Sequence, residues 1–109
     1  VVGWVVEATI GAMRSLPGRA QLAHPFSILP KVDLDEDAIP DALLARWAAE
    51  AAATGTLVEV NEKWACPGPR VVRAARVAGV RIVASTDAHV ATDVGRYDAV
   101  ARILAEADR

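Results

Sequence analysis

Three short apolar runs, each followed by a segment with helical spacing, constrain the fold of this chain more than any other feature. The runs are rich in Val, Ala and Leu and recur at intervals of roughly 30 residues, the length of a βαβ unit. Because strands joined by helices in such units run parallel, the alternation predicts an α/β fold with a parallel sheet. The predicted strands cover residues 20–24, 56–61 and 80–86.

Apolar residues at helical intervals predict four helices. Val6, Ile10 and Met13 recur at three- or four-residue spacing before the first strand, as on the buried face of a helix. Thr92 or Asp93 is expected to cap the last helix. The predicted helices cover 4–15, 40–54, 69–78 and 94–107. Six large side chains are expected to be largely buried: Trp47, Leu57, Val60, Ile82, Val83 and Leu104.

Composition limits the class of protein. The 109 residues suffice for one small core, and 53% of them are hydrophobic. A net charge of −2 without a basic patch gives no indication of nucleic acid binding. The single cysteine, Cys66, excludes a disulfide framework and favours a cytoplasmic location. No apolar run reaches the ~18 residues of a membrane span. The chain does not begin with Met, and we expect it to be part of a longer protein.

Potential metal ligands or other polar residues follow each predicted strand. His24 ends the first strand, Asn61 ends the second, and Asp87 and His89 follow the third. The carboxyl ends of parallel strands meet at one edge, where α/β proteins build their sites. Carboxylate and imidazole groups bind first-row metals. Simpler roles remain open: His24 as a loop residue held extended by Pro25, Asp87 as a cap, and His89 as an exposed side chain.

Glu59 and the acidic residues of the connection 26–37 have other possible roles. Glu59 lies within an apolar run, so its carboxylate needs a partner: a metal site inside a barrel, or a salt bridge to a neighbouring helix. The long connection 26–37 is acidic. Ala38 and Leu44 occupy the positions where a calcium-binding EF-hand needs Gly and Glu, so that motif is excluded. These carboxylates are expected to be solvated, near the start of the next helix.

Taken together, three segments resemble the PHP domain, the polymerase and histidinol phosphatase family. They are His24-Pro25-Phe26, Glu59-Val60-Asn61, and Ser85-Thr86-Asp87-Ala88-His89 followed by Val94-Gly95. The similarity extends from about residue 20 onward. It implies a distorted, TIM-like (β/α)7 barrel that binds two or three divalent metal ions (Zn, Mn or Fe). It also implies hydrolysis of a small phosphorylated substrate by a metal-activated water.

The resemblance implies roles for individual residues. His24, Asp87 and His89 match metal ligands of the family, with Asp87 also catalytic, and Asn61 matches a polar residue that lines the site. Lys63 or Arg96 could hold a phosphate oxygen, or could be solvated surface cations. The resemblance thus implies metal binding by His24, Asp87 and His89, and substrate binding by Asn61, Lys63 and Arg96.

The match is partial, because the family's early histidines and bridging glutamate have no counterpart among residues 1–109. The chain therefore resembles the C-terminal part of one PHP domain, and its activity is expected to need the N-terminal half. Two alternatives remain open. One is an amidohydrolase-type metal hydrolase, which the His24-Pro25 and Glu59-Val60-Asn61 segments disfavour. The other is a non-catalytic PHP-like scaffold module.

Overall fold

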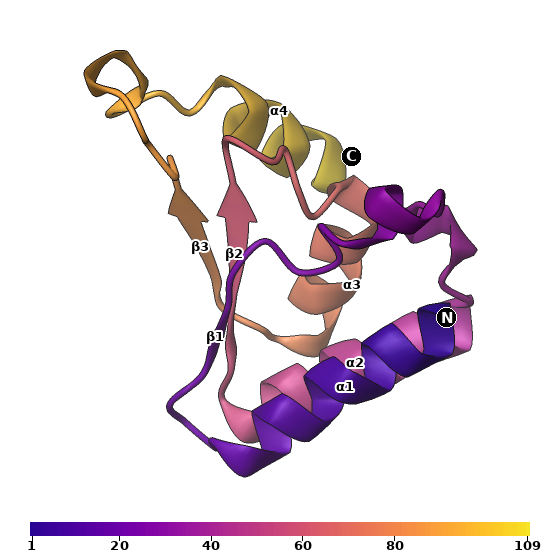
Figure 1. The fold of residues 1–109 in the computed structure, drawn as a ribbon. Helices are drawn as coiled ribbons and strands as arrows, with labels where there is room; N and C mark the ends of the chain where they lie inside the picture. Colours follow the sequence, from indigo (N-terminus) through magenta and orange to yellow (C-terminus); the bar gives the residue numbers. More distant parts are fainter.

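The computed structural model describes all 109 residues as a mixed α/β fold with a three-stranded parallel sheet and four α-helices (Figure 1). The strands are β1 (Gln21–Leu22), β2 (Leu57–Asn61) and β3 (Ile82–Ser85), in the spatial order β1-β2-β3. Both strand pairs are parallel, with Gln21 beside Leu57 and Asn61 beside Ser85. The predicted parallel sheet is thus confirmed.

All four helices lie on one side of this sheet, and the other side carries none (Figure 1). The helices are α1 (Val2–Ser15), α2 (Asp41–Thr54), α3 (Pro69–Ala78) and α4 (Asp98–Ala107). Along the layer, α2 contacts both α1 and α3, and α3 contacts α4. None of the helices combines the length and apolar character needed to span a bilayer.

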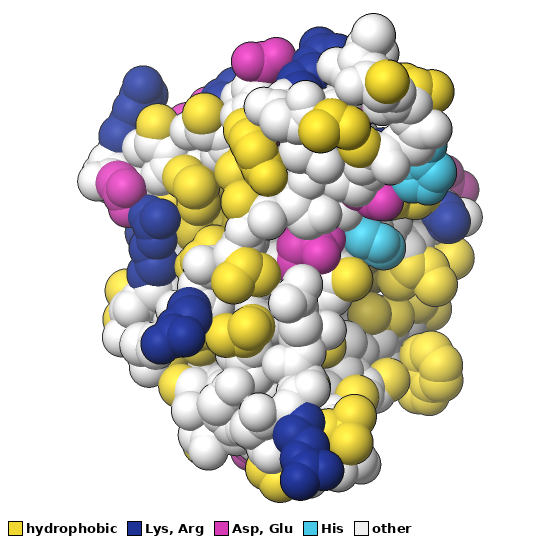
Figure 2. Space-filling view, turned by 90° about the vertical axis from the view of Figure 1, so that its left-hand side faces the viewer, with side chains coloured by type: hydrophobic (Ala, Val, Ile, Leu, Met, Phe, Trp, Pro, Cys, Tyr) yellow, Lys and Arg dark blue, Asp and Glu magenta, His cyan; other side chains and the backbone are white.

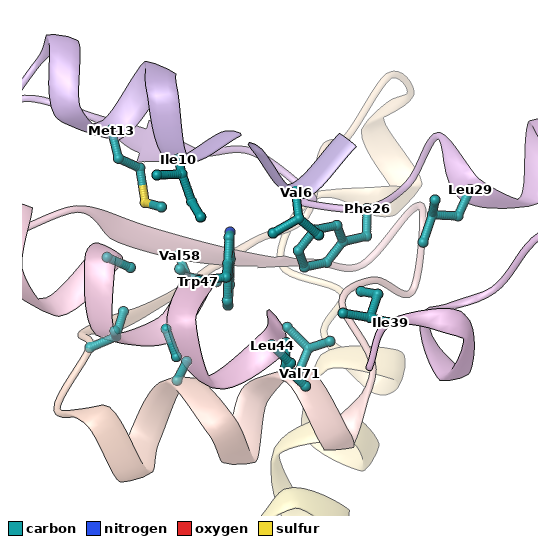
Figure 3. Close-up of a cluster of buried hydrophobic side chains, with 14 residues drawn as sticks. Val6, Ile10, Met13, Phe26, Leu29, Ile39, Leu44, Trp47, Val58 and Val71 are labelled. Carbon is teal, nitrogen blue, oxygen red and sulfur yellow. The ribbon is translucent and has the colours of Figure 1, made fainter. Parts of the chain in front are cut away.

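The main core lies between β2 and the helices α1, α2 and α3, and is centred on Trp47 (Figure 3). Trp47 is fully buried, and its ring lies 5.0 Å from that of Phe26, centroid to centroid. Val58 faces this core, whereas Val60 joins a second cluster formed with α3 and α4. The helix side of β2 is therefore sealed by apolar packing along its length. The second cluster consists of Val60, Val72, Val100, Ile103 and Ala107.

Burial follows the predictions for Trp47 and Val60, but four other side chains are only partly buried. Side chains alternate along a strand, so Leu57 points away from the helices, because Val58 points toward them. A sheet with helices on one side only leaves such positions partly open. Leu57 and Val83 are of this kind. Ile82, beside Val58, and Leu104, on α4, instead pack against the apolar clusters of the helix side and are only partly covered there.

The chain turns sharply where the first strand was predicted to continue. The strand stops at Leu22, and His24 has a φ of 33° rather than the extended conformation expected before Pro25. The turn is closed by a hydrogen bond from the Ser27 N–H to the His24 carbonyl, 3.1 Å long. Phe26 follows with a φ of 70° and is buried against Trp47. Core packing of Phe26 thus accompanies a backbone that the local preference disfavours.

The last helix begins later than predicted, at Asp98 instead of residue 94. Gly95 precedes it with a φ of 79°, which a right-handed helix does not allow. Neither Thr92 nor Asp93 caps the helix. The carboxylate of Glu62, at the end of β2, instead accepts hydrogen bonds from the N–H groups of Ala99 (3.1 Å) and Val100 (3.0 Å). A negative group at this end also favours the helix dipole.

Trp47→Ala should destabilise the protein by about 3–5 kcal/mol, because it removes the largest side chain of the core and leaves a cavity. The free energy of unfolding is measured by urea denaturation. Trp4→Ala is the matched control: this side chain is 76% exposed, so the change should stay within about 0.5 kcal/mol. Equal losses for the two variants would contradict the packing described for this core.

Candidate functional site

The parallel strands bring Asn61 and Asp87 together at the carboxyl edge of the sheet. Asn61 is 1% exposed, and its Nδ2 donates to Asp87 Oδ2 at 3.1 Å and to Glu59 Oε1 at 2.8 Å. Its Oδ1 accepts from the backbone N–H of Trp64 at 3.0 Å. The Asn61 amide is therefore the centre of a polar network that joins the ends of β2 and β3.

Asp87 and His89 form a local pair just beyond β3. Asp87 has a φ of 49°, and its N–H donates to Ser85 Oγ at 3.1 Å. His89 Nδ1 lies 2.7 Å from the Asp87 carbonyl and 3.8 Å from Asp87 Oδ1. A carbonyl can only accept, so Nδ1 of His89 carries the proton. The Lys63 ammonium, 3.4 Å from the same nitrogen, is then a neighbour of the ring and not a donor to it.

His24 reaches the same region through Trp64. Its Nδ1 lies 2.7 Å from Ser27 Oγ, and its ring centroid lies 5.5 Å from that of Trp64. His24 thus contacts the ring of Trp64, the residue whose backbone N–H donates to Asn61. Figure 2 views the side of the sheet that carries no helices. It shows histidine and acidic side chains close together on that face.

Glu59 is 7% exposed and forms no salt bridge to a neighbouring helix, which was one of the two pairings anticipated from the sequence. The other pairing, with a metal site inside a barrel, stays a prediction. Its partners are two neutral amides: Asn61 at 2.8 Å, and Gln21 Nε2, which donates to Oε2 at 3.3 Å. The sequence signal for this contact was the two-residue spacing of Glu59 and Asn61, which places both on one face.

The donor groups fit a divalent metal ion in their chemistry and in the bonds that orient them. The Nδ1 atoms of His24 and His89 are hydrogen-bonded, so Nε2 is the ring nitrogen left for a metal. Asp87 Oδ2 is held by Asn61, which leaves Oδ1. Such supporting bonds are typical of metal ligands. The chain by itself groups no three His, Cys, Asp or Glu side chains around one point. Shared metal binding by His24, Asp87 and His89 stays a prediction.

Lys63 and Arg96, the predicted phosphate-binding residues, line one small hollow of about 230 Å³. Thr86, next to Asp87, lines it too. Both cations are exposed, and Arg96 Nε also donates to Asp98 at 3.1 Å. Two cations beside the Asp87–His89 pair can attract an anion. Glu62 and Asp93 line the same hollow and oppose that attraction.

A larger hollow of about 610 Å³ lies beside Trp64, and Glu36 and Cys66 form part of its wall. The Glu36 carboxylate was expected to be solvated, but both of its oxygens accept from the Gly68 N–H, at 2.8 and 3.1 Å. Burial raises the pKa of Glu36, and the Gly68 hydrogen bonds oppose this shift. Burial, with the nearby Glu36 charge, also raises the pKa of the Cys66 thiol. Cys66 is therefore a poor nucleophile.

No protein-family model, no curated protein and no solved structure matches this chain.

Glu36→Gln should gain stability relative to the unsubstituted protein as the pH rises from about 4 to about 7. The pKa of Glu36 is raised above its ordinary 4.5, so the folded state holds the proton more tightly. The contribution of the Glu36 carboxyl to the free energy of unfolding is therefore fully present below the pKa of the unfolded state. It is lost as the pH rises through the pKa of the folded state. Glutamine can still accept from Gly68 and does not ionise. Urea denaturation at the two pH values measures the difference.

Asp33→Asn is the control for Glu36→Gln. Asp33 lies in the same connection and is exposed, and Asn tolerates its left-handed φ of 58°. Its stability relative to the unsubstituted protein should differ little between the two pH values. If Glu36→Gln behaved like Asp33→Asn, the burial of the Glu36 carboxylate would not govern its ionisation.

Proposed function

We propose that this chain supplies part of the active site of a PHP-type metal-dependent phosphoesterase, which hydrolyses a phosphomonoester with a metal-activated water. The observation that carries the proposal is the gathering of Asn61, Asp87 and His89 at one edge of a parallel sheet, with His24 against Trp64, which is hydrogen-bonded to Asn61. These positions also carry the resemblance to the PHP family.

In this proposal each residue has a role that follows from its chemistry. His24, Asp87 and His89 hold the metal, and Asn61 orients the Asp87 carboxylate. Divalent metal ions bound there would polarise phosphoryl oxygens and lower the pKa of a bound water. Lys63 or Arg96, which line the hollow next to Thr86, would bind a phosphate oxygen of the substrate.

The same proposal includes a larger barrel of the distorted (β/α)7 type, to which these three strands belong. The side of the sheet without helices carries Glu59 and Asn61, polar groups suited to the lining of such a barrel. The bridging carboxylate and the early histidines of the family would then come from a preceding part of the same polypeptide, and hydrolysis would require that part.

A non-catalytic PHP-like module is the second candidate. It is favoured by one observation, that the side chains of this chain form no group of three possible metal ligands. A module of this kind would keep the fold and the Asn61 network without turnover. The two candidates differ in whether phosphate release depends on Asp87.

Asp87→Ala in the full-length protein should lower phosphate release from p-nitrophenyl phosphate about a thousandfold in the presence of Mn²⁺. The substitution removes one metal ligand and with it several kcal/mol of transition-state stabilisation. Release of p-nitrophenolate is measured with and without added Mn²⁺, after removal of bound metal with a chelator.

Asp33→Asn, which changes an exposed carboxylate that contacts none of the site residues, serves again as the control and should retain full activity. Full activity of Asp87→Ala would refute the assignment of Asp87. An unsubstituted protein without metal-dependent release would favour the non-catalytic module.

A further inference from the structure

We propose that Glu59 is a positioning residue, which acts through the Asn61 amide to fix the Asp87 carboxylate. Glu59 belongs to no metal-ligand or phosphate-binding set in the function proposed above. Two hydrogen bonds connect it to the site: Asn61 Nδ2 donates to Glu59 Oε1 at 2.8 Å and to Asp87 Oδ2 at 3.1 Å. This one amide divides its two hydrogens between two carboxylates.

The orientation of the amide is set from its other end. The backbone N–H of Trp64 donates to Asn61 Oδ1 at 3.0 Å, and a backbone N–H can only donate. The oxygen of the amide must therefore face Trp64, and the NH₂ group must face the carboxylates. Because Asn61 is 1% exposed, water does not compete for any of these bonds.

Glu59 is itself held by a second hydrogen bond. Its second oxygen accepts from Gln21 Nε2 at 3.3 Å, and the residue is 7% exposed. Removal of the Glu59 acceptor would leave one Asn61 hydrogen buried without a partner, which costs free energy. The amide would shift to recover a partner, and its bond to Asp87 would lengthen or break. The contact between Glu59 and Asn61 thus supports the contact between Asn61 and Asp87.

This arrangement determines which oxygen of Asp87 is available. Oδ2 is taken by Asn61, and Oδ1 faces the ring of His89 at 3.8 Å. If Asp87 binds metal, as the proposed function requires, Glu59 and Asn61 are the outer partners that fix this ligand. Loss of such partners typically weakens metal binding 10- to 100-fold.

The test compares three variants of this chain. Glu59→Met removes the acceptor and introduces an apolar side chain of similar length. Glu59→Gln keeps an oxygen that can accept from Asn61. Gln21→Met removes the other partner of Glu59 and leaves the contact between Glu59 and Asn61 intact, so it is the matched control.

Side-chain amide signals in proton–nitrogen NMR spectra provide the first readout, without any metal. Asn61 is the only asparagine and Gln21 the only glutamine, so Gln21→Met also assigns the Asn61 signals. Glu59→Met should speed exchange of the Asn61 side-chain protons with solvent about tenfold, because a bond is lost. Glu59→Gln and Gln21→Met should leave that exchange within about twofold. Unchanged exchange in a folded Glu59→Met variant would overturn the proposal.

Zn²⁺ titration calorimetry on the same proteins provides the second readout. Glu59→Met should raise the Kd for Zn²⁺ about 10- to 100-fold, and Glu59→Gln should restore it to within about threefold. Equal Kd values for Glu59→Met and the unsubstituted protein would also overturn the proposal. An unsubstituted chain without Zn²⁺ affinity would count against the proposed metal site, and the exchange rates would then decide the role of Glu59.

Discussion

β2 is the strand with a neighbour on both edges, and its parallel pairing with β1 and β3 determines which residues meet at the carboxyl edge of the sheet. The register places Asn61 beside Ser85, so the chain leaving β3 passes Asn61. Asp87, two residues later, comes within 3.1 Å of the Asn61 amide. A register shifted by one residue would turn Asn61 to the helix side and separate the two groups.

The alternation of side chains along β2 divides its contacts between two faces. Val58 and Val60 pack against the helices, whereas Glu59 and Asn61 face the other way. The same alternation continues past the end of the strand. Glu62 reaches the first turn of α4, and Lys63 approaches His89. One short segment therefore holds α4 in place and also builds the polar edge.

The sequence predicted the parallel sheet and the helices because periodic apolar residues with clear glycine stops leave few other folds. It did not predict contacts formed between distant residues. The turn at His24 goes with the burial of Phe26 against Trp47, and the start of α4 depends on Glu62. Glu36 was assigned to solvent because its connection is acidic, although Gly68 lies next to it in space.

Within the candidate site, the strand-end positions of Asn61, Asp87 and His89 could be inferred from the sequence, because parallel strands end at one edge. The hydrogen bond between Asn61 and Glu59 could not be inferred in this way. The need of a buried carboxylate for partners was evident, but the sequence offered a metal or a basic side chain. The structure supplies two neutral amides, one of which also holds Asp87.

The most direct test of the central claim is paramagnetic relaxation in NMR spectra of this chain titrated with Mn²⁺. If the carboxyl edge of the sheet is a metal-binding face, substoichiometric Mn²⁺ will broaden the signals of His24, Asp87 and His89 together. Signals from α1, on the helix side, will stay sharp. Broadening confined to the acidic segment 33–37, with the signals of Asp87 and His89 unaffected, would contradict the account.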